Sequence, residues 1–181
     1  MFSAVDGATA RLWSLSINDR KPAPFRDVSS SNALNAEFSP DGRWVAYTQR
    51  RGTLVTTIYL EPFPPTGERL SVTRPDDVGH HAMWNRDGNT LFYVPGAQSL
   101  TAVRIVRKGT SLSLGEPQDW PGKLANVNPF RAPRNSRISL DGKRFIFVGP
   151  AGLSQTGANG GLRIDVVVNW TEELRARLPA Q

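Results

Sequence analysis

The chain has 181 residues, 39% of them hydrophobic, so it is long enough to bury the core of one ordinary domain. It contains no cysteine, which excludes a disulfide framework, a thiolate metal site and a cysteine nucleophile. The net charge of +6 comes mostly from arginines scattered along the chain, which argues against a nucleic-acid partner, and no apolar run approaches the length of a membrane span.

The amino-terminal stretch predicts a strand after a tight turn. Met1 to Asp6 lacks a basic region followed by an apolar one, so the chain as given carries no secretion signal and is expected in the cytoplasm. Asp6-Gly7 is typical of a hairpin turn, and residues 11–17 (RLWSLSI) alternate apolar and polar side chains as a half-buried strand does. A polar loop is expected to follow this strand, and residues 26–35 (RDVSSSNALN) are expected to lead into the next hairpin.

The central pattern of the sequence is a hairpin that occurs three times. Its copies are residues 38–47 (FSPDGRWVAY), 84–93 (WNRDGNTLFY) and 138–147 (ISLDGKRFIF). Each copy places Asp-Gly between an apolar residue and an apolar strand that closes on an aromatic, because Asp bonds the nearby backbone and Gly accepts positive φ. The copies lie about 46 and 54 residues apart, which is typical of propeller blades or a related array of short strands.

Each hairpin is followed by further predicted strands, which gives modules of four strands. The first module adds residues 56–63 and 68–73, the second adds 100–106 and a strand within 112–120, and the third crosses a glycine-rich loop, 149–161, to reach 162–168. In residues 169–179 the spacing of apolar residues no longer follows the alternation of a strand. Asn169 as a cap, acids in the first turn, basic residues in the last and Pro179 predict a short carboxy-terminal helix.

The predicted fold is all-β, with antiparallel four-stranded β-propeller blades, about three of them, and a short C-terminal helix. We expect a single partial propeller domain over 1–181, with blade remnants at 1–30, blades at 31–75, 80–122 and 134–168, and the helix at 169–179. The three hairpin copies, the PFP turn after a third strand and the closing VVVNWTEEL resemble the carboxy-terminal part of a TolB-type, WD40-like propeller. In bacteria, such propellers often follow a kinase domain, a regulatory domain or a secretion signal. The resemblance therefore implies a family whose members are often periplasmic or extracytoplasmic.

The resemblance implies a ring of six or more blades, and half a ring leaves its edge strands unpaired. Two interpretations follow: the chain is a fragment of a larger propeller, or it forms a homo-oligomer that completes the ring.

The candidate catalytic residues lie in the predicted loop 76–81, which should open onto the propeller channel with loops 27–37 and 126–137. Asp76, Asp77, His80 and His81 place the only two histidines next to two carboxylates, the combination that a general base needs. The plainer interpretation makes both histidines polar loop residues, of which at most one faces the channel.

The other candidates lie in the two flanking loops, apart from Asp77, which also belongs to loop 76–81. Asn32, Arg131 and Arg134 are the candidate ligand-binding residues, and Glu37, Asp77 and Asn128 could supply oxygen ligands to calcium, although no calcium-loop motif is present. No nucleophile elbow, Walker loop or dinucleotide fingerprint occurs.

Two functions fit the sequence. The first is a non-catalytic module that binds a protein or small ligand at the funnel mouth. The alternative is a metal-assisted hydrolase of a lactone or ester, in which His80 or His81 activates water, Asp76 or Asp77 orients it and calcium polarises the carbonyl. Only the architecture of lactone-hydrolysing propellers, and not their ligand pattern, is similar to this chain.

Overall fold

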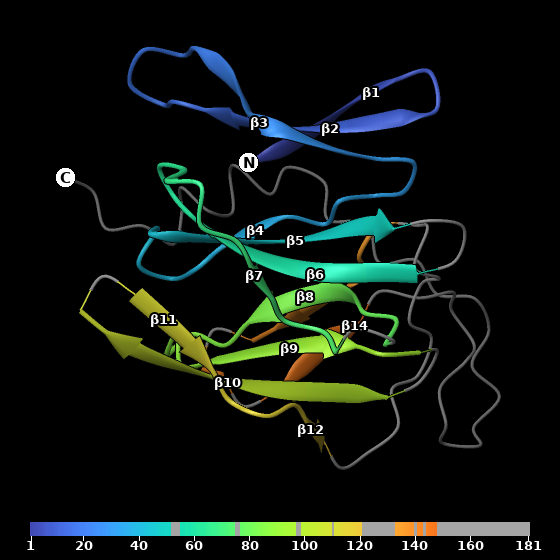
Figure 1. The fold of residues 1–181 in the computed structure, drawn as a ribbon, viewed down its shortest axis with the longest axis vertical. Coiled ribbons are helices and arrows are strands. Elements are labelled where there is room, and N and C mark those ends of the chain that lie inside the picture. Colours follow the sequence, from blue (N-terminus) through green and yellow to red (C-terminus); the bar gives the residue numbers. More distant parts are fainter. Residues whose placement is uncertain are drawn as a thin grey trace, which may run out of the picture. The chain divides into compact units, whose positions relative to one another are not determined.

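The fold is described from a computed structural model, which covers residues 1–51, 55–74, 77–96, 99–109, 111–120, 133–139, 141–142 and 144–147. The chain divides into two compact units, Met1–Val148 and Gly149–Gln181, and every described residue belongs to the first. The described elements are all strands, paired antiparallel in four sheets, which confirms the all-β prediction (Figure 1). Within the described ranges, no helix is long and apolar enough to cross a membrane.

The first sheet contains β1 (Phe2–Asp6), β2 (Thr9–Leu15) and β3 (Pro22–Ser30), in that order. Gly7 has φ 57° in the two-residue turn that joins β1 to β2, so the predicted Asp6-Gly7 hairpin is confirmed. The prediction of a loop at residues 27–37 is wrong for 27–30, which belong to β3, and for Glu37, which begins the next strand. The register between β2 and β3 is irregular, and Arg26 within β3 has φ 52°, so the apolar alternation of a regular strand is absent there.

The second sheet contains β4 (Glu37–Phe38), β5 (Trp44–Arg51), β6 (Val55–Pro62) and β7 (Leu70–Ser71). The predicted turn joins β4 to β5: the Ser39 N–H donates to the Trp44 carbonyl at 2.7 Å, and the Gly42 N–H donates to the Ser39 carbonyl at 2.8 Å. Asp41 accepts bonds from the Ser39 hydroxyl at 2.5 Å and the Arg43 N–H at 3.2 Å. The Asp-Gly pair therefore closes the hairpin as its sequence predicts.

The same turn recurs in the next two sheets. The third sheet contains β8 (His80–Trp84), β9 (Thr90–Val94), β10 (Leu100–Lys108) and β11 (Ser111–Leu114), and β12 (Gln118–Trp120) also pairs with β10. The fourth sheet pairs β13 (Ser136–Ile138) with β14 (Phe145–Phe147). Gly88 and Gly142 have φ 67° and 70°, matching Gly42 at 71°. The repeat is therefore confirmed in backbone geometry, while the single strand expected within 112–120 is corrected to two, β11 and β12, on different stretches of β10.

The first three sheets stack face to face in chain order (Figure 1). Three apolar clusters join neighbouring sheets. In β5, Trp44 and Ala46 join the cluster shared with the third sheet, whereas Val45 and Tyr47 join the cluster shared with the first. Alternate side chains of this strand thus enter different cores, because successive residues of a strand point to opposite faces. A third cluster, with Met83, Phe92, Ile138 and Phe145, joins the third sheet to the fourth.

The expected loop 149–161, strand 162–168 and helix 169–179 lie outside the described residues, as do the candidate site residues Asp76, Asn128 and Arg131.

Candidate functional site

The two histidines lie inside strand β8 and not in an open loop, which corrects the placement expected from the sequence. The exposed fractions of His80 and His81 are 3% and 0%. The pairing of β8 with β9 shifts register between His80 and Met83, and His81 has φ 54°, so an irregularity in the strand buries two consecutive imidazoles. Their rings meet edge to face, with centroids 4.5 Å apart.

Burial also changes the acid–base chemistry of His80. Desolvation, and then the neighbouring His81, lower the pKa of His80 to about 4, although a backbone hydrogen bond with Gly96 opposes the shift. A general base at neutral pH works best with a pKa near 7. The environment of His80 therefore suits a neutral, buried imidazole better than a catalytic one.

Asp77 lies at the surface and forms an ion pair with Arg74. The Arg74 Nη1 and Asp77 Oδ2 atoms are 3.4 Å apart, and the Asp77 N–H donates to the Arg74 carbonyl at 3.2 Å. The carboxylate is thus engaged within its own loop. Among the described residues, no group of three or more His, Asp or Glu side chains could hold a metal ion.

Glu37, a predicted metal ligand, is instead held by arginine. The Arg134 Nη1 atom lies 2.7 Å from Glu37 Oε2 and also donates to the Ala82 carbonyl, while Arg137 Nη1 lies 3.6 Å from Glu37 Oε1. The Arg134 N–H donates to Asn35 Oδ1 at 2.8 Å. Arg134, predicted to bind a ligand, thus links β4, β8 and the segment before β13.

We expect Arg134→Met to lower the free energy of unfolding by about 2 kcal/mol, because the largely buried guanidinium makes charge-assisted bonds that methionine cannot replace. Chemical denaturation measures the change. The matched control is Arg137→Met, since this side chain is 73% exposed and its pair with Glu37 is longer, so its loss should change stability by less than about 0.5 kcal/mol. Equal effects for the two variants would contradict the assigned role of Arg134.

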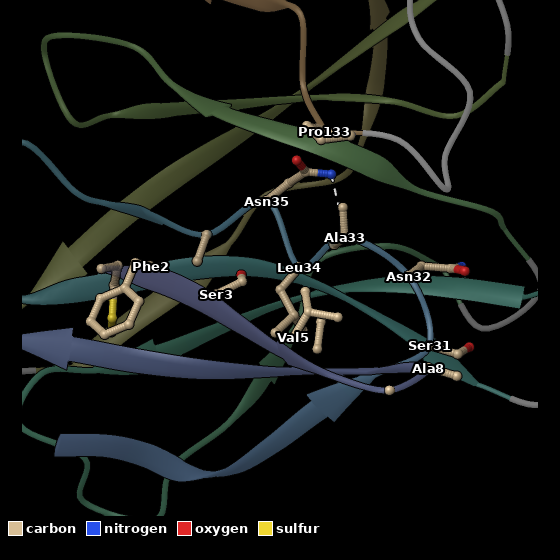
Figure 2. A pocket seen from close by; sticks show the side chains of 14 residues that line it. Phe2, Ser3, Val5, Ala8, Ser31, Asn32, Ala33, Leu34, Asn35 and Pro133 are labelled. Atoms are coloured by element: carbon tan, nitrogen blue, oxygen red, sulfur yellow. Dashed lines mark hydrogen bonds between the residues drawn. The ribbon is translucent and has the colours of Figure 1, made fainter. Parts of the chain in front are cut away.

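A hollow lies beside β1, and we term it the edge groove. It is bounded by β1 and by residues 31–36, with Pro133 at one side, and its volume is about 620 Å³ (Figure 2). Figure 2 shows Phe2, Ser3 and Val5 of β1 on one side and Leu34 among the residues opposite. A second hollow of about 650 Å³ adjoins it and shares Asn35, Ala36 and Pro133.

The side chains that line the edge groove are uncharged and largely small. Among the described residues that form it are four alanines, Ala8, Ala10, Ala33 and Ala36. Asn32, predicted as a ligand-binding residue, also lines it; the side chain is only 6% exposed, and its Nδ2 atom is buried with no hydrogen-bond partner in the part of the chain that the structure describes. An unsatisfied buried donor is costly unless a partner reaches it.

The edge groove was not predicted, apart from Asn32, because it depends on which strand of the first sheet lies at the edge. Asp6-Gly7 indicated the hairpin, but the order of the sheet could be known only once β3 was recognised as a strand on the far side of β2.

In comparisons with known proteins, no protein-family model and no curated protein matches the chain.

Proposed function

We propose that this chain is a non-catalytic binding module with the blade arrangement of a β-propeller, and that its ligand occupies the edge groove. Three features support the blade arrangement. The second sheet is a four-stranded antiparallel meander, and the first three sheets stack face to face. In addition, β8 contacts both β4 and β13, so the first strands of three consecutive sheets gather at one side, as they do around a propeller channel.

The observation that carries the binding function is the edge groove itself. Ligand sites are typically concave, mostly apolar and supplied with a few polar groups that fix orientation. A volume of about 620 Å³ and a lining of small uncharged side chains, among them the hydroxyls of Ser3 and Ser31, fit that description.

The burial of His80 and His81 favours binding over hydrolysis. In the hydrolase alternative an imidazole must reach water and substrate, but both rings are enclosed within the sheet stack, and Asp77 pairs with Arg74. We therefore expect no turnover on a panel of esters and lactones, with or without calcium.

The experiment that tests the proposal is a screen of small uncharged fragments and short peptides by amide chemical-shift mapping. We expect binders to shift the amides of residues 3–5 and 31–36, and Ala8→Trp to abolish those shifts, because an indole at this exposed position would fill one end of the groove. Ala23→Trp, on the exposed part of β3 and absent from the groove lining, is the matched control and should bind as wild type does. Shifts confined to the adjoining hollow near Arg137 and Ile146, or no binders, would overturn the proposal.

A further inference from the structure

The geometry points to an extended peptide as the ligand: we propose that an uncharged segment of a partner polypeptide pairs with the outer edge of β1 as an added strand and places alternate side chains in the edge groove. This inference rests on the proposed function and names its ligand class.

The outer edge of β1 has backbone groups available for such pairing. The sheet order β1-β2-β3 places β1 at an edge. A two-residue turn joins Asp6 to Thr9, so this closing pair exchanges hydrogen bonds, and pairs alternate along the ladder. Ala4 and Phe2 consequently point their N–H and C=O groups toward β2, whereas Ser3 and Val5 point theirs outward. Two donors and two acceptors therefore face the space beside the strand.

The edge lacks the features that usually prevent pairing with another chain. Edge strands are commonly protected by charge, proline or bulges. All of β1 is exposed, Val5 to 73%, and its only charged residue is Asp6 at the turn. Ser3 and Val5 themselves line the edge groove, so the free backbone groups and the hollow belong to one surface (Figure 2).

The lining determines the chemistry of the occupant. A charged side chain would lose its hydration in the edge groove without gaining an opposite charge from the side chains that line it, so uncharged apolar side chains are favoured. Alternate side chains of a strand point to the same face, and the alanines leave room for them.

The test uses a synthetic probe, the fluorescein-labelled peptide Lys-Thr-Val-Thr-Val-Thr-Val-Lys with an amidated end, and two N-methylated versions. One version carries methyl groups on the valine nitrogens and the other on the threonine nitrogens. Because alternate N–H groups of a strand point to the same edge, only one of the two patterns should block pairing with β1. Fluorescence polarisation should show a loss of affinity of about tenfold or more for one pattern and little change for the other.

Two measurements on the protein locate the contact. Hydrogen exchange of the Ser3 and Val5 amides should slow by about tenfold or more with saturating peptide, because these N–H groups become bonded. Val5→Pro removes one outward N–H without removing a bond to β2, so it should lower the affinity for the peptide by about tenfold. The control Val5→Thr retains this N–H and should bind the peptide as wild type does. The methylated peptides test the inference even where the proline variant fails to fold.

The outcomes separate this inference from the proposed function. Equal binding of both methylated peptides, or groove binding by fragments but not by the peptide, overturns strand addition and leaves the binding function intact. Failure of fragments and peptide alike overturns both. A dimer in light scattering that the peptide dissociates would identify a second copy of this chain, and not a foreign segment, as the occupant.

Discussion

Replacing both arginines that face Glu61 should lower the free energy of unfolding by about 3–5 kcal/mol, since it leaves a buried carboxylate without its countercharges. Glu61 lies on β6 and is 1% exposed. Its Oε2 atom accepts from Arg26 Nη1 at 2.9 Å, and its Oε1 atom lies 3.6 Å from Arg69 Nε and accepts from the Tyr47 hydroxyl at 2.5 Å. The variant Arg26→Met/Arg69→Met retains bulk at both positions, and denaturation at pH 7 measures the loss.

The control restores charge balance in the same background. Adding Glu61→Gln removes the isolated charge and keeps an acceptor for Tyr47, so at least half of the lost stability should return. Burial first, and then the bond to Glu61, raise the pKa of Tyr47, because both oppose ionisation of the phenol. If Glu61→Gln destabilised the double variant further, the arginines would not be acting as countercharges.

Acidification should cost about 3 kcal/mol of stability through His80 alone. The pKa of His80 is lowered from 6.5 to about 4 in the folded protein, so between these values the unfolded chain binds more protons than the folded one. Stability contributed by the neutral imidazole is therefore complete above pH 6.5 and is lost as the pH falls toward 4. Urea unfolding at half-unit intervals of pH measures the slope.

His80→Gln separates this effect from the titration of carboxylates. Glutamine retains polarity but does not titrate, so the variant should be less stable at pH 7 and show a flatter profile between pH 6.5 and 4. Asp41 does not contribute to the difference between the two stability profiles. Its pKa is lowered from 3.8, so it titrates below the range from pH 6.5 to 4. An unchanged slope in His80→Gln would contradict the burial of a neutral imidazole.

The hairpins could be predicted because the information for them is local. A Gly at positive φ, an Asp that accepts from the N–H two residues on, and flanking apolar residues all fall within ten residues, as at Asp41 and Gly42. The same turn chemistry gives the same backbone bonds at Gly88 and Gly142 wherever the copy occurs.

Features that depend on distant strands were missed. The register irregularity in β3 and the prolines Pro22 and Pro24 hide its apolar alternation, so pairing with β2 decides its structure. The polar sequence around His80 and His81 predicted a loop. In the structure β5 and β6 pack against β8, and this contact between the second and third sheets buries both histidines. The polar composition of this stretch predicted that the two histidines would be exposed, but packing between the sheets buries them.

Burial of β5 on both faces limits how this sequence can diverge. Trp44 and Ala46 occupy one core while Val45 and Tyr47 occupy another, so a single residue gained or lost within the strand would send every following side chain into the wrong core. Substitutions can be absorbed one at a time, but a change of length cannot. Related chains should therefore keep the number of residues between the Asp41-Gly42 turn and the end of β5 constant, and vary in length at their loops.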